Sequence, residues 1–154
     1  MATTCYLDRR STRQLSLVAT GVLVVAVVFL LVSHLLFARG TFPIVLQAVA
    51  GALMLWARVT FGGRSFHAGA DPTEGGLVTT GPYRFIRHPI YAAILLFLWA
   101  GIASHGSIVG VLSGIVATGA IAVRIGTEES LVVESYPEYV EYARRTKRII
   151  PFVL

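Results

Sequence analysis

Long apolar runs alternate with short polar segments along this chain, and the pattern predicts a helical membrane protein. Residues 14–38 contain no Asp, Glu, Lys or Arg, and these 25 residues suffice to cross the roughly 30 Å hydrocarbon core of a bilayer. Residues 40–57 form a second uncharged stretch, and Pro43 near its start suits the first turn of a helix. We therefore expect two membrane spans, over about 15–37 and 42–60.

A third uncharged stretch covers residues 89–123 and is too long for one ordinary span. The sequence His-Gly-Ser at 105–107 lies near its middle and is typical of a tight turn between helices. We expect a helical hairpin with spans over about 90–104 and 107–125, each short for a full crossing. The second half begins with small residues that recur every four positions and favour close packing within the hairpin: Gly106, Gly110 and Gly114.

The positions of the cationic residues predict how these spans are oriented. Basic residues gather before the first span, between 58 and 88, and from 124 onward, whereas the 105–107 turn contains no Lys or Arg. By the positive-inside rule, both termini and the 58–88 segment face the cytoplasm of a multi-pass protein in the cell (inner or plasma) membrane. The first apolar run exceeds the 7–15 residues of a signal-peptide core, so it is expected to stay as an anchor.

Composition supports this fold class and excludes others. Hydrophobic residues make up 55% of the 154 positions and charged residues 14%, whereas soluble domains carry about 25% charged residues. The net charge is +5, yet no Lys/Arg run is interleaved with aromatic residues as a nucleic-acid surface requires. Cys5 is the sole cysteine, and His67 and His105 lack partners at metal-ligand spacing. We predict one all-α, polytopic membrane domain over residues 1–154, with no metal and no nucleic-acid partner.

The first polar segment, residues 75–91, begins as a Gly-rich loop and turns at Gly81-Pro82. Pro89 suits the start of the third span, which places Arg87 and His88 where that helix meets the cytoplasmic interface. Free backbone N–H groups at a helix start favour an anion or a carboxylate. The alternative is that the arginines of this segment contact lipid headgroups and that its tyrosines belong to an interfacial aromatic belt.

The second polar segment, residues 124–151, begins with an Arg–Glu pair. Arg124 and Glu128 are four positions apart and share one face of a helix that leaves the membrane, and Glu129 is adjacent. Such a pair at membrane depth is costly unless it is buried in protein or lies beside a polar cavity. Two adjacent carboxylates suit a cationic ligand or ribose hydroxyls. The alternative is a surface salt bridge of little energetic value.

Residues 134–148 are predicted to form a further amphipathic helix after the spans. Tyr136, Tyr139 and Tyr142 follow one another at steps of three, which places them on one stripe. Tyrosine ring faces attract cations, including a sulfonium. The alternative is an interfacial helix that lies on the membrane through its tyrosines and its basic residues.

Jointly, these motifs resemble the isoprenylcysteine carboxyl methyltransferase family, to which phospholipid methyltransferases are related. The resemblance covers about two-thirds of the chain, residues 50–152, and its strength lies in the order of the motifs around one hairpin. It rests on four stretches: LWARVTFGGRSF at 55–66, GPYRFIRHPIY at 81–91, RIGTEESL at 124–131 and YPEYVEYARRTKRIIP at 136–151.

The resemblance implies a membrane methyltransferase that uses S-adenosylmethionine, releases S-adenosylhomocysteine and binds this cofactor at the cytoplasmic face. It implies that Arg124 and Glu128 lie near the reacting groups, as catalytic residues, and an exchange of roles between Glu128 and Glu129 stays open. The positions that match the cofactor motifs are Leu77, Val78, Tyr83, Arg87, His88, Tyr91, Glu129, Tyr139 and Tyr142.

Two departures from the family pattern bear on the methyl acceptor. Tyr136-Pro137 stands where many relatives have Phe-Gly, and a single span precedes the 42–60 helix, fewer than in eukaryotic members. The expected acceptor is a lipophilic small molecule or a lipid. The expected reaction is most like the O-methylation of an isoprenylcysteine carboxyl group. Alternatives are N-methylation of a phospholipid amine or S-methylation of a small thiol. Alternatives from other classes are a four-span transporter, which would need an ionisable residue near the midplane, and a non-catalytic membrane scaffold.

Overall fold

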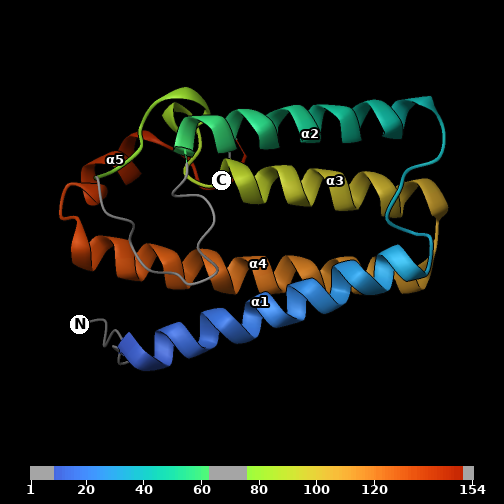
Figure 1. Cartoon of the computed structure of the whole chain (residues 1–154), viewed down its shortest axis with the longest axis horizontal. Coiled ribbons are helices and arrows are strands. Elements are labelled where there is room, and N and C mark those ends of the chain that lie inside the picture. The colour runs from blue at the N-terminus through green and yellow to red at the C-terminus, as the bar shows by residue number, and fades with distance from the viewer. Residues whose placement is uncertain (1–8, 63–75, 151–154) are drawn as a thin grey trace.

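The computed structural model describes residues 9–62 and 76–150, and the regular elements in these ranges are all helical. Cys5, His67 and the remainder of 63–75 lie outside the described residues. Figure 1 shows the long helices side by side, with short helical elements gathered at one end. The elements are, in order, α1 (Arg9–Val32), α2 (Thr41–Phe61), the 3₁₀ helix η2 (Gly81–Arg84), α3 (Pro89–His105), α4 (Ile108–Ser135) and α5 (Tyr139–Arg145).

The helices α1, α2 and α4 are long and apolar enough to cross a membrane, and α3 is a shorter apolar helix. Many of their large apolar side chains point outward and are exposed, among them Val25, Phe42 and Ile115. Soluble proteins rarely leave such large apolar surfaces uncovered, whereas lipid covers them without penalty. The chain is thus an all-α, polytopic membrane protein, as the apolar pattern predicts.

α1 begins and ends earlier than the predicted span over 15–37. The helix stops at Val32 because His34 adopts a left-handed backbone with φ of 57°. The N–H groups of the next two residues both turn back to the carbonyl oxygen of Leu30. Hydropathy does not register this turn, because residues 33–37 carry no Asp, Glu, Lys or Arg.

α3 and α4 form the predicted hairpin. Gly106 takes a left-handed backbone with φ of 60°, and the Ser107 hydroxyl caps α4 by accepting a hydrogen bond from the Gly110 N–H over 3.3 Å. At Gly114, a Cβ atom would lie 2.7 Å from the Ile102 side chain. The small residues at the start of α4 therefore allow the two helices of the hairpin to approach closely.

The C-terminal part differs from the expected arrangement. α4 runs unbroken to Ser135, well past the predicted end of the fourth span at about residue 125. The expected helix over 134–148 is wrong in its bounds, since α5 covers Tyr139–Arg145. Tyr136 ends α4 with extended backbone and Pro137 follows it, so the three tyrosines do not share one helical stripe.

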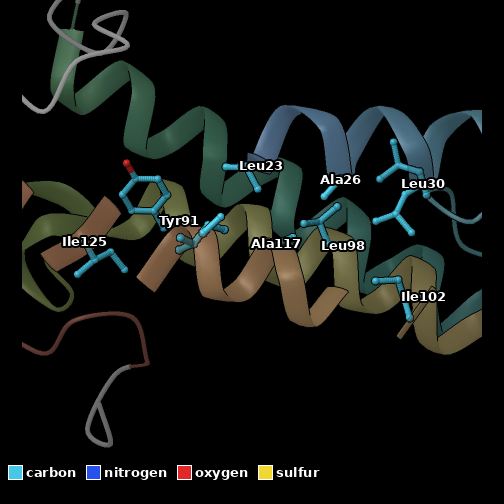
Figure 2. Packing of buried hydrophobic residues seen from close by; sticks show 11 residues of the cluster. Leu23, Ala26, Leu30, Tyr91, Leu98, Ile102, Ala117 and Ile125 are labelled. Atoms are coloured by element: carbon cyan, nitrogen blue, oxygen red, sulfur yellow. The ribbon is translucent and has the colours of Figure 1, made fainter. Parts of the chain in front are cut away.

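The long helices pack as two pairs, α1 against α4 and α2 against α3, and the α3–α4 contact joins the pairs. Figure 2 shows the buried side chains between α1, α3 and α4, including Leu30, Ile102 and Ala117. The start of α1, the end of α2, the start of α3 and the end of α4 lie at the same end of the bundle (Figure 1). Both polar segments are therefore carried to that end.

Candidate active site

The two polar segments are joined by backbone hydrogen bonds at this end of the bundle. The N–H of Arg87 donates to the carbonyl of Lys147 over 2.7 Å, and the N–H of His88 donates to the carbonyl of Arg148 over 3.0 Å. The N–H of Lys147 donates in return to the carbonyl of Phe85 over 3.2 Å. The C-terminal segment is thus paired with the backbone just ahead of α3.

Glu129 lies at the centre of a charged network. Its Oε1 accepts a hydrogen bond from Nε of Arg87 over 3.0 Å and one from Oη of Tyr139 over 3.3 Å, and lies 3.4 Å from Nε2 of His88. Its Oε2 accepts from Nε of Arg148 over 3.0 Å. The Glu129 side chain is 13% exposed, and the two guanidinium groups compensate its charge.

Arg87 is occupied by the protein itself. Besides its bond to Glu129, Nη1 donates to the backbone carbonyls of Ala143 over 2.8 Å and Thr146 over 2.6 Å. These bonds hold α5 and the segment after it against the start of α3. The alternative in which this arginine contacts lipid headgroups is therefore wrong, and Tyr83 and Tyr91 are likewise buried and form no interfacial belt.

Arg124 is held in a second, deeper cluster. Its side chain is 8% exposed, Nε donates to Oη of Tyr91 over 2.7 Å, and Nη2 donates to Oε1 of Glu128 over 2.9 Å. Nη1 donates to the hydroxyl of Thr20 on α1, and the Tyr91 hydroxyl donates to Oε1 of Glu128. The Arg124–Glu128 pair is thus an interior ion pair with neutral hydrogen-bonding partners, not a surface salt bridge.

Glu128 stands between the two clusters and keeps one oxygen turned toward His88. Its Oε2 lies 3.9 Å from Nδ1 of His88, and its side chain is 23% exposed, more than that of Glu129. His88 thus faces one carboxylate with each ring nitrogen. Because Glu128 is partly accessible while its charge is balanced by Arg124, it is the carboxylate best placed to meet an incoming group.

The tyrosines from η2 and α5 pack beside the Glu129 network. Oη of Tyr142 donates to the backbone carbonyl of Tyr83 over 2.7 Å, and the rings of Tyr139 and Tyr142 meet at 63° with centroids 5.7 Å apart. Burial raises the pKa of Tyr142 to about 12, against the opposing field of Arg87. Burial also raises the pKa of Tyr83 and of Tyr139. All three phenols stay neutral in the physiological range.

Most of the predicted site residues lie in this one region. Leu77 and Val78 are partly buried in the extended segment before η2, and no described contact joins them to the two charged clusters. Within the described residues, no group of three or more His, Cys, Asp or Glu side chains is arranged to hold a metal ion. The residues that the structure brings together are Tyr83, Arg87, His88, Tyr91, Arg124, Glu128, Glu129, Tyr139 and Tyr142.

Two members of these clusters were missed by reasoning from sequence. Thr20 lies in an apolar span that also contains Ser16 and Ser33, so no local signal distinguishes it from a helix-packing residue. Arg148 belongs to the basic run that the alternative interpretation places on the membrane, and it pairs with Glu129 over 2.9 Å. In the same run, Arg145 pairs with Glu141 over 2.7 Å at the surface.

An apolar cavity of about 530 Å³ opens between α1, α2 and α3. Its walls begin one turn beyond the Arg124 cluster: Leu23 and Val24 follow Thr20 on α1, and Ala93 and Ile94 follow Tyr91 on α3. Its volume falls in the range of ligand-binding pockets, about 300–1,000 Å³. The apolar cavity thus begins within about one helical turn of Thr20 and of Tyr91 along α1 and α3.

The chain is similar in sequence to proteins that are named for metal resistance. The chain is 34% identical over 126 residues to the cobalt-zinc-cadmium resistance protein CzcN of Cupriavidus metallidurans, covering 78% of this chain and 51% of the relative. It is 33% identical over 102 residues to the nickel-cobalt-cadmium resistance protein NccN of Alcaligenes xylosoxydans xylosoxydans, covering 63% of this chain and 42% of the relative. The chain thus spans about half the length of these curated relatives or less. No solved structure matches it.

A family model described as phospholipid methyltransferase matches residues 37–139, which is more than half of the chain. The matched range begins after α1 and contains both Glu128 and Glu129, together with His88 and Arg124. The helices, the order of the motifs and this match agree. The chain therefore belongs to the phospholipid methyltransferase family of integral membrane methyltransferases, which includes the isoprenylcysteine carboxyl methyltransferases.

Proposed function

We propose that this chain transfers a methyl group from S-adenosylmethionine to a lipophilic acceptor. The reaction that we propose is most like the O-methylation of an isoprenylcysteine carboxyl group. The observation that carries the proposal is the position of the Glu128–Glu129 pair, with His88 between the carboxylates and an apolar cavity beyond Arg124. Charged clusters at one end of the bundle and an apolar cavity between its helices suit two reactants of opposite character.

The donor and acceptor groups of the site fit S-adenosylmethionine. Ribose hydroxyls and an amino group are hydrogen-bond donors, for which the partly exposed Glu129 carboxylate is an acceptor. When bound, the cofactor supplies an electrophilic methyl group and leaves as S-adenosylhomocysteine, whose sulfur keeps the electron pair of the broken bond. The residues that we assign to its binding are Leu77, Val78, Tyr83, His88, Tyr91, Glu129, Tyr139 and Tyr142, with Arg87 positioning Glu129.

Arg124 is the residue that we assign to a carboxyl acceptor, because its positive charge attracts an ionised carboxyl group. Glu128 is the residue that we assign to an amine acceptor, because Arg124 and the Tyr91 hydroxyl both donate to its Oε1 and leave Oε2 for the incoming group. Burial around Arg124 excludes water from the deeper cluster and so limits hydrolysis and misalignment. The cavity between α1, α2 and α3 would hold the lipophilic part of the acceptor.

N-methylation of a phospholipid amine is the second candidate. The accessibility of Glu128 favours it, because an ammonium group is attracted to a carboxylate that can also take its proton. A carboxyl acceptor is already ionised near neutral pH and needs no base. The size of the apolar cavity argues against a small thiol as the natural acceptor.

By the positive-inside rule, the end of the bundle that carries both clusters faces the cytoplasm. The cofactor would then enter from the cytoplasm, and the acceptor would enter sideways from the bilayer. Both termini would lie on the cytoplasmic side of the cell membrane.

Calorimetric titration of the protein in lipid nanodiscs with S-adenosylmethionine and S-adenosylhomocysteine tests the proposal. We expect saturable binding by the wild type, weakened at least about tenfold in Glu129→Gln, because a charged hydrogen-bond acceptor contributes about 1.5–3 kcal/mol. Glu141→Gln is the matched control, since this carboxylate is exposed and pairs with Arg145 outside the site.

Acceptors are then compared with S-adenosylmethionine labelled in its methyl group. The three probes are N-acetyl-S-farnesylcysteine, phosphatidylethanolamine vesicles and dodecanethiol. Methylation of one of them by wild type and by Glu141→Gln, but not by Glu129→Gln, supports the proposal. Absence of cofactor binding by folded wild type in nanodiscs would refute it and would favour a scaffold or a transporter.

A further inference from the structure

One side chain of α1 reaches the buried cation of the deeper cluster. The Thr20 hydroxyl accepts a hydrogen bond from Nη1 of Arg124 and donates its own proton to the carbonyl of Ser16 over 2.8 Å. Because that proton is engaged, the hydroxyl presents its lone pairs to the guanidinium group. Thr20 therefore acts toward Arg124 only as a hydrogen-bond acceptor, and its lone pairs have a fixed orientation.

Three helices together orient this guanidinium group. Its Nε is bound to Tyr91 of α3, its Nη2 to Glu128 of α4 and its Nη1 to Thr20 of α1. A guanidinium group is planar and its donors point in fixed directions, so acceptors on three elements define one orientation. The contribution of α1 lies outside the family match, which begins at residue 37.

Thr20 also marks the boundary between the charged cluster and the apolar cavity. Leu23 and Val24, one turn further along α1, line the cavity. The polar end of a ligand in this cavity would meet the Arg124–Glu128 pair at the level of Thr20. Thr20 therefore orients Arg124 at the position where the reacting group of an acceptor would lie.

We infer that Thr20 is a positioning residue for the methyl acceptor, because its hydroxyl holds Arg124 in the orientation from which the Arg124–Glu128 pair meets the reacting group. This inference rests on the proposed function. It gives α1 a part in the reaction besides that of a membrane anchor. This role requires the hydroxyl group and not the shape of the side chain. A substitution that keeps the shape but removes the hydroxyl therefore distinguishes the two contributions.

The test compares Thr20→Val, which keeps the shape, with Thr20→Ser, which keeps the hydroxyl. Thr118→Val is the matched control, because the Thr118 hydroxyl also donates to a helix carbonyl, that of Gly114 over 2.7 Å, and accepts from Trp99 over 3.1 Å away from the site. The kcat and KM are measured in nanodiscs with S-adenosylmethionine and whichever of the three acceptor probes is methylated. The dissociation constant for S-adenosylhomocysteine is measured alongside.

We expect Thr20→Val to lower kcat/KM for the acceptor at least about tenfold, in line with a hydrogen bond to a charged group. The dissociation constant for S-adenosylhomocysteine should stay within about twofold. Thr20→Ser and Thr118→Val should stay within about twofold of wild type in both quantities. A parallel loss of cofactor affinity and activity in Thr20→Val would point to a structural role and overturn the inference.

A second readout follows Arg124 without turnover. In a ¹⁵N–¹H spectrum of the arginine Nε–H groups, the Arg124 signal is identified by its absence in Arg124→Lys. We expect it to shift or broaden in Thr20→Val and to stay in place in Thr20→Ser and Thr118→Val. An unchanged kcat/KM in Thr20→Val overturns the inference whatever this signal does, and leaves the proposed function intact. Wild type that binds no cofactor and methylates no probe overturns both together.

Discussion

At the residue scale, the site pairs opposite charges that would be costly to bury singly. Arg124 is buried, its charge is balanced by Glu128, and the hydroxyl groups of Thr20 and Tyr91 accept its other hydrogen bonds. Glu129 is balanced by guanidinium groups of the fold itself. Removing one partner of a buried pair is costly because the other charge stays uncompensated. Conservative changes that keep volume are therefore the informative ones here.

Replacing Glu128 by Gln distinguishes the candidate acceptors. For an amine or thiol, kcat should fall by a factor of about 10²–10⁴, because the general base is lost. For a carboxyl acceptor, no proton has to be removed, and kcat should stay within about tenfold of wild type. The measurement is the single-turnover rate at saturating cofactor. Equal losses for both acceptor types would contradict the assignment of Glu128 as the base.

Replacing Tyr142 by Phe should change how stability depends on pH. The variant loses the hydrogen bond to the carbonyl of Tyr83, which costs about 1 kcal/mol at neutral pH. In the wild type, burial raises the pKa of Tyr142 to about 12, above the ordinary value near 10. The stability that this phenol contributes is thus complete below pH 10 and is lost as the pH rises toward 12.

The difference in Tm between wild type and Tyr142→Phe should therefore narrow as the pH rises from 10 toward 12. It is measured by thermal unfolding in nanodiscs at several pH values. A difference that stays constant over this range would show that the phenol does not titrate with the fold. Tyr136→Phe serves as the comparison, because Tyr136 lies at the end of α4 and not in the Tyr139–Tyr142 ring pair.

At the element scale, the unbroken course of α4 sets the geometry of the site. Arg124, Glu128 and Glu129 lie on one helix that leaves the apolar part of the bundle and continues to Ser135. Their relative directions therefore follow helical periodicity and not loop conformation. Arg87 then holds α5 and the following segment against the start of α3 and so closes the network around Glu129.

Gly126 offers a direct test of this continuity. A Cβ at Gly126 would meet nothing within 4 Å, so Gly126→Ala should raise stability by about 0.5–1 kcal/mol and keep activity. Gly126→Pro removes a helical hydrogen bond and kinks the helix between Arg124 and Glu128. It should abolish cofactor binding. Denaturation and calorimetry of both variants check this, and a proline variant with wild-type affinity would contradict the role of α4.

At the scale of the whole molecule, two helix pairs leave an apolar cavity between α1, α2 and α3, while both polar segments meet at one end. The order of the helices brings this about, because each successive long helix runs opposite to the one before (Figure 1). Every second connection therefore returns to the same end. The charged clusters and the cavity are products of that arrangement.

The orientation of this arrangement in the cell membrane is a prediction that thiol labelling can check. In a Cys5→Ser background, Arg144→Cys lies at the site end and Ile108→Cys at the hairpin turn, and both positions are exposed. A membrane-impermeant maleimide should label the second variant in intact cells and the first only after permeabilisation, as the positive-inside rule requires. The reverse pattern would place the site outside the cytoplasm.

The sequence by itself determined the fold class and the segments that carry the chemistry. Uncharged runs of this length are stable only in a bilayer or in a protein core. The length of such a run is a local property of the chain, so it can be read from the sequence. The hairpin at Gly106, the Arg124–Glu128 pair on one helical face and the polar segments around His88 and Glu129 were predictable for the same reason.

The tertiary structure alone decided which of these groups meet. The bond between Thr20 and Arg124 joins positions 104 residues apart, and the pairing of Arg148 with Glu129 takes a surface cation into the site. The early end of α1 at His34 also follows from a turn that hydropathy does not register. Such features depend on how whole helices pack, and a hydroxyl or a left-handed residue within an apolar run has no periodicity that would reveal its partner.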